Sequence, residues 1–332
     1  KKQVFERRRY WIEGKKLDSM REEGMMYEID VLSQPFYELE DHLVYGRIVM
    51  PGASSMSMVI EHGREELKYE GGIVLEGVEL REAVLIEGES FILCFEYENE
   101  TKGQRKFIVR AKEEEEKVYL VGRIGRGEMN KRREVEEQQE YNKLIEGREI
   151  WGRGKEFAVE WGSSFRWVKE GRYSKKWKRG KFWMKKPEGM EWKMELPSGL
   201  LDSMFQASGV FGDEEKEFQA PFYVERLEVG RIQREKEMIL LINGMEVEEK
   251  RSICSEMKLV GEEGEVMMKV KGFVSVETNE NRFLRQTKRG SRLYYAVVWK
   301  KSKLKKKHEK VKNINMMKGC VLKEKLEKIG MK

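Results

Sequence analysis

The order of structural elements along the chain repeats once, and this repeat limits the folds that the sequence can adopt. In the first half, extended segments from residue 26 onward end at Pro51-Gly52. Apolar residues at helical spacing then predict a helix over residues 53–69. Four strand-like segments, separated by glycine and glutamate, follow between residues 73 and 124. The first half is therefore predicted to contain strands, a break, one helix and four more strands.

The second half repeats this order. Strand-like segments end at Pro197-Ser198-Gly199, a short apolar helix is predicted over 200–211, and four strand-like segments follow between residues 223 and 276. The halves are offset by about 150 residues, the length of one small domain. A sheet that wraps one helix is a hotdog-like unit, and two units can join their sheets and remove an exposed edge. We predict an α+β double hotdog. Two unrelated α+β domains are the alternative, which the matched order disfavours.

The distribution of charge argues against nucleic acid as a partner. The net charge is +6, but residues 300–332 contain 13 lysines against 3 glutamates, a net charge of +10. Subtracting this from +6 leaves the rest of the chain at −4. A mildly acidic body is a poor surface for phosphate contacts, so we interpret the basic segment as a solvated linker. No uncharged apolar run approaches the roughly 18 residues of a membrane span.

The cysteines indicate the compartment. Cys94, Cys254 and Cys320 are odd in number and far apart, which argues against a disulfide framework and against a CxxC metal site. The first two lie in apolar, strand-like segments, where a cysteine is usually packing material. We therefore expect a reducing, cytoplasmic setting.

His42 is the histidine whose surroundings suit chemistry. It begins an extended segment that ends at Met50, whereas His308 lies in the lysine-rich segment. His62 lies in the charged second half of the predicted first helix, where we expect it to be exposed. Burial at the start of a strand disfavours the imidazolium, and a neutral imidazole is what a general base needs. A purely structural histidine is the alternative interpretation, and this observation alone leaves it open.

The residues after His42 favour a ligand at this place. Gly46 lets the backbone pass close to a ligand or another strand. Pro51-Gly52 ends the strand and begins the helix, for which Ser54 or Ser55 is the predicted cap. The unpaired N–H groups of that helix N-terminus suit a thioester oxygen that gains charge.

Asp202 is the acidic residue of the apolar second helix. One interpretation is structural, because an acid in the first turn stabilises the helix dipole or caps the helix. Gln206 follows four residues later on the same face, so its amide could hold the carboxyl in one orientation. A carboxyl among leucine, methionine and phenylalanine has a raised pKa and can donate a proton. A base from one repeat and an acid from the other would form a dehydration pair.

Three motifs in these segments resemble those of polyketide synthase dehydratase domains. His42-Leu-Val-Tyr-Gly46-Arg-Ile-Val-Met-Pro51 resembles their HxxxGxxxxP motif, and Asp202-Ser-Met-Phe-Gln206 resembles their DxxxQ motif. The two occur in the family's order and with similar spacing, one in each repeat. Trp161-Gly162-Ser163-Ser164-Phe165 resembles the YGPxF motif, with tryptophan and serine where the motif has tyrosine and proline. Further similarity at residues 4–11, 220–227 and 293–299 extends the resemblance over almost the whole chain.

The resemblance implies a role for each of these residues within a double hotdog. His42 would be the general base and Asp202 the general acid of a water elimination, with Gln206 orienting Asp202. Gly46 would lie against the thioester through its backbone N–H, and Pro51 would fix the turn into the first helix. The remaining motif residues would contact or support the substrate: Trp161, Gly162 and Phe165.

The resemblance also implies a substrate, partners and an organisation. The substrate would be a (3R)-3-hydroxyacyl thioester on the phosphopantetheine of an acyl carrier protein, and the product a trans-α,β-enoyl thioester. No metal or cofactor of the domain itself is implied. Neighbouring synthase domains and a second copy, as a homodimer, would be partners. The expected organisation is a post-acyltransferase linker at 1–20, an N-terminal hotdog at 21–137, a linker with the C-terminal hotdog at 138–290, and a basic linker toward the next synthase domain at 291–332.

Other functions of the same scaffold remain open at this stage. An enoyl isomerase or a ring-forming variant would use the same base. Asp202 and Pro51 favour dehydration, because an isomerase has no hydroxyl to protonate. A non-catalytic module that only binds an acyl chain is the alternative from a different class, and it would leave that chain unchanged.

Overall fold

The structure of the chain, a computed structural model, describes most of the segment between residues 24 and 283. Contacts divide the chain into two units, residues 1–293 and 294–332, and every described element belongs to the first unit. The linkers predicted at the two ends lie outside the described residues. The described residues are 24–30, 39–87, 91–99, 103–112, 117–128, 141–192, 194–212, 218–232, 237–247, 251–280 and 283.

The first half contains one long helix and eight strands among its described residues. A 3₁₀ turn, η1, precedes β2, and the helix α1 follows the short hairpin of β2 and β3. The predicted helix over 53–69 is thus confirmed to within two residues at each end. The elements are β1 (Gly24–Asp30), η1 (Leu39–Asp41), β2 (His42–Val44), β3 (Arg47–Met50), α1 (Gly52–Leu67), β4 (Gly72–Leu80), β5 (Val84–Leu85), β6 (Ile92–Asn99), β7 (Gln104–Ala111) and β8 (Val118–Gly127).

The second half repeats the order of a helix followed by long strands, as predicted. Its helix α3 continues into a 3₁₀ turn, η3. The elements are β9 (Lys143–Glu146), α2 (Gly147–Glu156), β10 (Val159–Trp161), η2 (Ser163–Phe165), β11 (Val168–Ser174), β12 (Arg179–Met184), α3 (Ser198–Ser208), η3 (Gly209–Phe211), β13 (Phe218–Val229), β14 (Met238–Val247), β15 (Arg251–Gly261) and β16 (Val266–Thr278).

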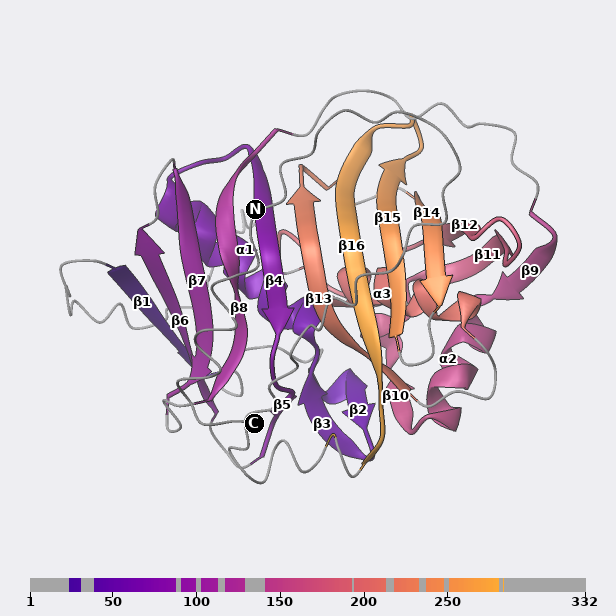
Figure 1. Cartoon of the computed structure of the whole chain (residues 1–332), viewed down its shortest axis with the longest axis horizontal. Coiled ribbons are helices and arrows are strands. Elements are labelled where there is room, and N and C mark those ends of the chain that lie inside the picture. The colour runs from indigo at the N-terminus through magenta and orange to yellow at the C-terminus, as the bar shows by residue number, and fades with distance from the viewer. Residues whose placement is uncertain are drawn as a thin grey trace, which may run out of the picture. The chain divides into compact units, whose positions relative to one another are not determined.

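Two antiparallel sheets contain all of these strands (Figure 1). Within the described residues, the large sheet has 12 strands in the order β1-β6-β7-β8-β4-β13-β16-β15-β14-β12-β11-β9. The small sheet has four strands in the order β10-β2-β3-β5. Since β10 comes from the second half and β2 from the first, both sheets contain strands of both halves.

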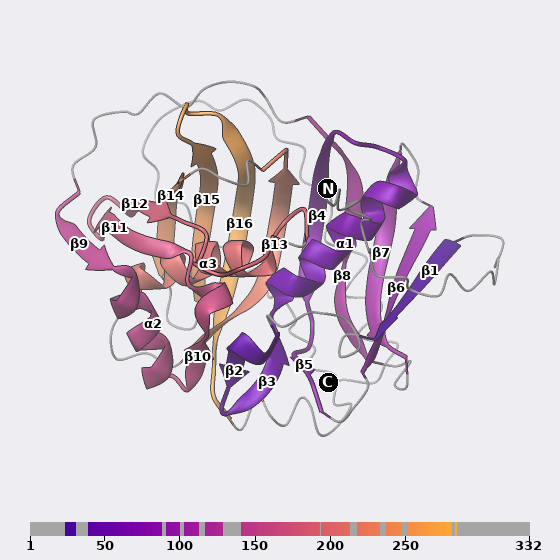
Figure 2. The ribbon, with the colours of Figure 1, turned by 180° about the vertical axis from the view of Figure 1, so that it is seen from behind.

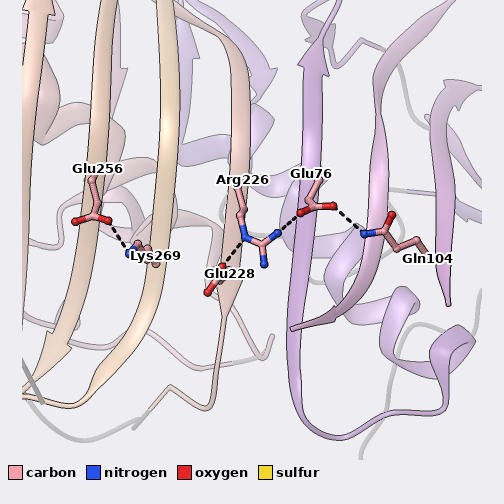
Figure 3. Close-up of polar contacts among 6 residues, drawn as sticks. All are labelled: Glu76, Gln104, Arg226, Glu228, Glu256 and Lys269. Atoms are coloured by element: carbon pink, nitrogen blue, oxygen red, sulfur yellow. Dashed lines mark hydrogen bonds and ion pairs between the residues drawn. The ribbon is translucent and has the colours of Figure 1, made fainter. Parts of the chain in front are cut away.

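The two halves of the large sheet meet at the pair β4–β13. Leu75 pairs with Leu227 there, and both side chains are fully buried. On the other face of the same strands, Arg226 forms ion pairs with Glu76 of β4 and Glu228 of β13 (Figure 3). The halves therefore join their sheets into one, and the joint is apolar toward the helices and polar on the opposite face.

The helices α1 and α3 cover one face of the large sheet (Figure 2). They contact each other, and their apolar side chains form the centre of the core. Burying a leucine- or methionine-sized side chain contributes about 1.5–3 kcal/mol. Several such side chains hold the two helices against the sheet and against each other: Met56, Val59, Ile60, Leu200, Leu201 and Met204. None of the described helices is long and apolar enough to span a bilayer.

Two predictions about the helices are wrong. Neither Ser54 nor Ser55 caps α1: Pro51 is the N-cap, and its carbonyl accepts the backbone N–H groups of both serines at 2.9 and 3.4 Å. His62 is not exposed but 6 % accessible, with its ring stacked on Tyr27 at 5.0 Å. It lies three residues after Val59 and therefore on the buried face of α1, although its sequence neighbours are charged.

The helix α2 and its flanking strands β9 and β10 were not predicted. Only two residues of α2 are large and apolar, so the segment lacks a clear helical period. Its start is fixed instead by a capping box, in which the side chains of Glu146 and Glu149 each accept the other's backbone N–H.

Candidate active site

A tight hairpin positions His42. The strands β2 and β3 are joined by Tyr45 and Gly46, whose φ angles of 51° and 70° are those of a two-residue turn of type I′. This turn places His42 opposite Val49, and the His42 Nδ1 lies 2.7 Å from the Val49 carbonyl oxygen. Because a carbonyl only accepts, Nδ1 must carry a proton. In the neutral ring, Nε2 is therefore left as the proton acceptor.

The protonation state of His42 is set mainly by burial. The side chain is 7 % exposed, and desolvation lowers its pKa below the usual value for histidine. The charge of Asp202 and the hydrogen bond to Val49 act in the opposite direction and raise the pKa, but they do not reverse the shift. His42 is therefore neutral near pH 7, the state that a general base requires.

Asp202 lies in the second turn of α3, because that helix begins at Ser198 with Pro197 as its N-cap. The alternative interpretation of Asp202 as a cap or first-turn acid is therefore wrong. Its carboxyl is buried, and Gln206 Nε2 donates a hydrogen bond to Oδ2 at 2.8 Å, as the four-residue spacing predicted. Desolvation raises its pKa, while His42, Gln206 and Trp161 lower it by smaller amounts.

His42 and Asp202 act on each other's pKa, so the structure brings the predicted base and acid together. Burial favours the uncharged form of both groups: a neutral imidazole and a protonated carboxyl. A neutral imidazole can accept one proton and a protonated carboxyl can deliver another in the same reaction.

The turn η2 links Asp202 to His42. The Phe165 carbonyl accepts hydrogen bonds from Ser203 Oγ at 2.8 Å and from Gln206 Nε2 at 3.1 Å. The Phe165 ring lies 5.3 Å from the His42 ring, centroid to centroid. Gln206 thus bonds to Asp202 and to the backbone at Phe165 with the same nitrogen, which fixes the carboxyl relative to the turn.

Asp41 secures this turn, a role that was not predicted. Its carboxylate accepts the Ser164 backbone N–H at 2.9 Å and the Ser164 hydroxyl at 2.6 Å. The hydroxyl of Ser163, which replaces the motif's proline, adds a bond at 3.2 Å. Gly162 donates its N–H to the Asp41 carbonyl at 2.6 Å, and a Cβ at Gly162 would lie 2.0 Å from the Asp41 carboxylate. The sequence signal that could have predicted this role is the position of Asp41 immediately before His42.

Gly199, in the segment Pro197-Ser198-Gly199, allows a close backbone contact at the start of α3. A Cβ at this position would lie 1.9 Å from the Ser164 carbonyl oxygen, so only glycine lets the first turn of α3 approach the turn η2 this closely. The close approach places α3, and with it Asp202, against the segment that follows β10.

The other predicted residues have distinct positions. Trp161 ends β10 and pairs with His42 across the small sheet, so the structure places it beside the predicted base. Pro51 is buried and is the N-cap of α1. Gly46 lies at the exposed tip of the hairpin, where a Cβ would meet no atom within 4 Å, and its contact with a thioester stays a prediction.

The site offers side chains for proton transfer. Among the described residues, no group of three or more histidine, cysteine, aspartate or glutamate side chains has an arrangement that could hold a metal ion. A buried imidazole and a buried carboxyl at one site are the groups that general acid–base chemistry requires, so the fold and the site indicate the class of enzymes that move protons by side chains.

The comparison with protein families agrees with this class. The model described as polyketide synthase dehydratase domain matches residues 14–112, and the one described as polyketide synthase dehydratase N-terminal domain matches residues 130–284. The chain belongs to the polyketide synthase dehydratase family, whose members are hydro-lyases of 3-hydroxyacyl thioesters. None of the curated proteins compared with the chain matches it.

Solved dehydratase structures share the fold. The CurJ dehydratase H978F inactive mutant in complex with a compound has a TM-score of 0.72 at 18 % identity, over 81 % of this chain and 97 % of that one. The dehydratase domain from the CurF module of the curacin polyketide synthase has a TM-score of 0.70 at 18 % identity, over 80 % and 98 %. The dehydratase domain of a mycocerosic acid synthase-like polyketide synthase has 0.65 at 16 %, over 77 % and 92 %. The predicted double hotdog is confirmed.

Proposed function

We propose that His42 and Asp202 are the base and the acid with which this dehydratase domain eliminates water from a 3-hydroxyacyl thioester. The observation that supports this most strongly is the pairing itself. The His42 imidazole from β2 and the Asp202 carboxyl from α3 are both buried against the turn η2. The Phe165 ring lies 5.3 Å from the His42 ring, and the Phe165 carbonyl accepts from the same Gln206 nitrogen that binds Asp202. The alternative interpretations, a structural histidine and a helix-capping acid, do not require the two side chains to be buried at the same place.

The proposed reaction moves two protons. His42 Nε2 takes the proton from the α-carbon, and the electrons of that C–H bond form the new double bond between the α- and β-carbons. The bond from the β-carbon to oxygen breaks as Asp202 gives its proton to the departing hydroxyl, which leaves as water. The products are an enoyl thioester, an imidazolium and a carboxylate. The two side chains then exchange a proton, through water or directly, and return to their starting states.

The surrounding residues orient the two groups. Gln206 holds the Asp202 carboxyl at 2.8 Å, and Gly162 and Phe165 shape the turn beside His42. The N-terminus of α1, fixed by Pro51, and the backbone N–H of Gly46 would stabilise the thioester oxygen as it gains charge. Both proton transfers use side chains, so the proposed reaction needs no metal or cofactor in the domain itself.

The wider assignments are proposals as well. The substrate would arrive on the phosphopantetheine of an acyl carrier protein, from synthase domains joined through the segments 1–20 and 291–332. We place the two hotdogs at 21–137 and 138–290. A homodimer is supported by β1, which among the described strands has a neighbour on one side only. The free, buried Cys94 and Cys254 suit a cytoplasmic location.

The test is to follow the intact mass of a 3-hydroxyacyl carrier protein incubated with the domain. We expect the wild type to remove the mass of one water, and H42A and D202N to leave the substrate unchanged. S57A is a control, because Ser57 is buried in α1 without a hydrogen-bond partner among the described residues. Because the equilibrium can favour hydration, the enoyl thioester is tested in the reverse direction. A wild type that is inactive in both directions would refute the proposal.

A further inference from the structure

The position of Trp161 is fixed both at its backbone and at its indole ring. It pairs with His42 in the ladder between β10 and β2, and its carbonyl accepts a hydrogen bond from Arg166 Nε at 2.8 Å. The six-membered ring of its indole lies on Gly154 of α2, where a Cβ would come within 2.1 Å of Cζ3. Only a glycine at position 154 is compatible with this ring position. The helix α2, which was not predicted, thus supplies the surface against which Trp161, the residue in place of the motif's tyrosine, packs.

The indole nitrogen of Trp161 is the part of the side chain that bears on Asp202. The Trp161 Nε1 is buried and has no hydrogen-bond partner of full geometry among the described residues. It is nevertheless near enough to Asp202 to lower the pKa of that carboxyl. A buried N–H without a partner is unfavourable. The nearby carboxyl of Asp202 is the group that becomes an anion when the proposed reaction proceeds.

An indole N–H differs chemically from the hydroxyl of tyrosine. It can donate a hydrogen bond, but it cannot accept one, and it is not an acid near neutral pH. Trp161 therefore cannot take the place of Asp202 as proton donor. It can stabilise the carboxylate that remains after Asp202 has lost its proton, because hydrogen bonds to a charged acceptor are stronger than those to a neutral one.

We propose that Trp161, seated on Gly154, is a positioning residue whose indole N–H binds the Asp202 carboxylate as the proton leaves for the substrate. Three groups then act on this carboxyl: Gln206 from its own helix, His42 from β2 and Trp161 from β10. The inference rests on the proposed role of Asp202, but the contact itself can be measured without turnover.

The first test observes the indole N–H directly. In protein labelled with ¹⁵N in the indole of tryptophan, the Trp161 signal is identified by its loss in W161F. We expect this signal to shift as Asp202 titrates in the wild type and in H42A, and to be independent of pH in D202N. A signal that does not respond to pH, or that responds equally in D202N, would overturn the proposal, whether or not the domain dehydrates its substrate.

The second test uses kinetics and a matched pair of glycines in α2. G154A pushes the indole away, whereas G152A adds a methyl group that meets no atom within 4 Å. We expect G154A and W161F to lower kcat by about tenfold, the loss of one hydrogen bond to a charged group. In both variants the limb of the pH profile where Asp202 ionises should move to higher pH, and G152A should match the wild type. Unshifted pH profiles in W161F and G154A would overturn the proposal.

Discussion

Two adjacent residues of α1, Glu61 and His62, should change the free energy of unfolding in opposite directions as the pH falls. Burial of the His62 ring lowers its pKa from 6.5 to about 4, with desolvation as the cause. Burial also raises the pKa of Glu61 from 4.5 to about 7, although the Glu195 N–H, which donates to its Oε2 at 3.0 Å, and Arg64 lower it in part. The substitutions that separate the two effects are H62F, which keeps an aromatic ring beside Tyr27, and E61Q.

The sign of each effect follows from which state of the chain binds the proton more strongly. The unfolded chain protonates His62 first, so the stability present above pH 6.5 is lost as the pH falls through 4. The folded chain protonates Glu61 first, so the stability present below pH 4.5 is lost as the pH rises through 7. Each difference corresponds to about 3 kcal/mol, an upper bound for Glu61 because its carboxyl is partly in contact with water. In the wild type the two contributions nearly cancel between pH 4.5 and 6.5.

The assay is urea unfolding between pH 4 and 7, followed by tryptophan fluorescence, with each variant compared with the wild type at every pH. Relative to the wild type, H62F should gain up to about 3 kcal/mol on acidification and E61Q should lose a similar amount. The other carboxylates titrate in all three proteins, so their contribution to the free energy of unfolding cancels when each variant is compared with the wild type. Three curves that stay parallel from pH 7 to pH 4 would refute the reasoning.

Three further substitutions test the contacts that hold the site and the joined sheet. S203A should lower the free energy of unfolding by about 2 kcal/mol in urea, because it removes a buried hydroxyl between the Phe165 carbonyl and the Trp167 N–H; a loss near zero would show that the hydroxyl is not needed. D41A should lower kcat by at least about tenfold with an unchanged circular dichroism spectrum, because Ser164 loses its acceptor; full activity would contradict this role. R226A should cost at most about 1 kcal/mol, and less in high salt, since its ion pairs are partly exposed; a larger, salt-independent loss would contradict the surface assignment.

The repeat was predictable because both halves use the same local signals. Pro51 and Pro197 each end an extended segment and begin a helix, and these prolines are the N-caps that the structure shows. Most strands of the large sheet are long and rich in apolar residues. The strand pattern visible in the sequence therefore agrees with the contacts that the strands make in the folded chain. By contrast, α2 depends on a capping box and on its contacts with β10, and its charged sequence gave little signal.

The positions of His42 and Asp202 in the fold could be predicted from their motifs, and so could the contact of Gln206 with Asp202, but the contacts made by Asp41 and Gly154 could not. His42 and Asp202 lie in motifs of fixed spacing, whereas Asp41 and Gly154 contact the site across more than 100 residues of sequence or from a separate element. Sequence spacing does not reveal such contacts. His62 was misjudged because its charged neighbours suggested an exposed face, although a helix can bury one residue of a charged segment.

His42 and Asp202, as we propose them, act as one unit on one reacting centre. The most direct measurement is the single-turnover rate of dehydration in H42A, in D202N and in the double variant. Residues that act together lose most of their effect with the first substitution. We therefore predict that the double variant is no slower than the slower single variant. A double variant slowed by the product of the two single effects would contradict the claim, because it would show two groups that contribute independently.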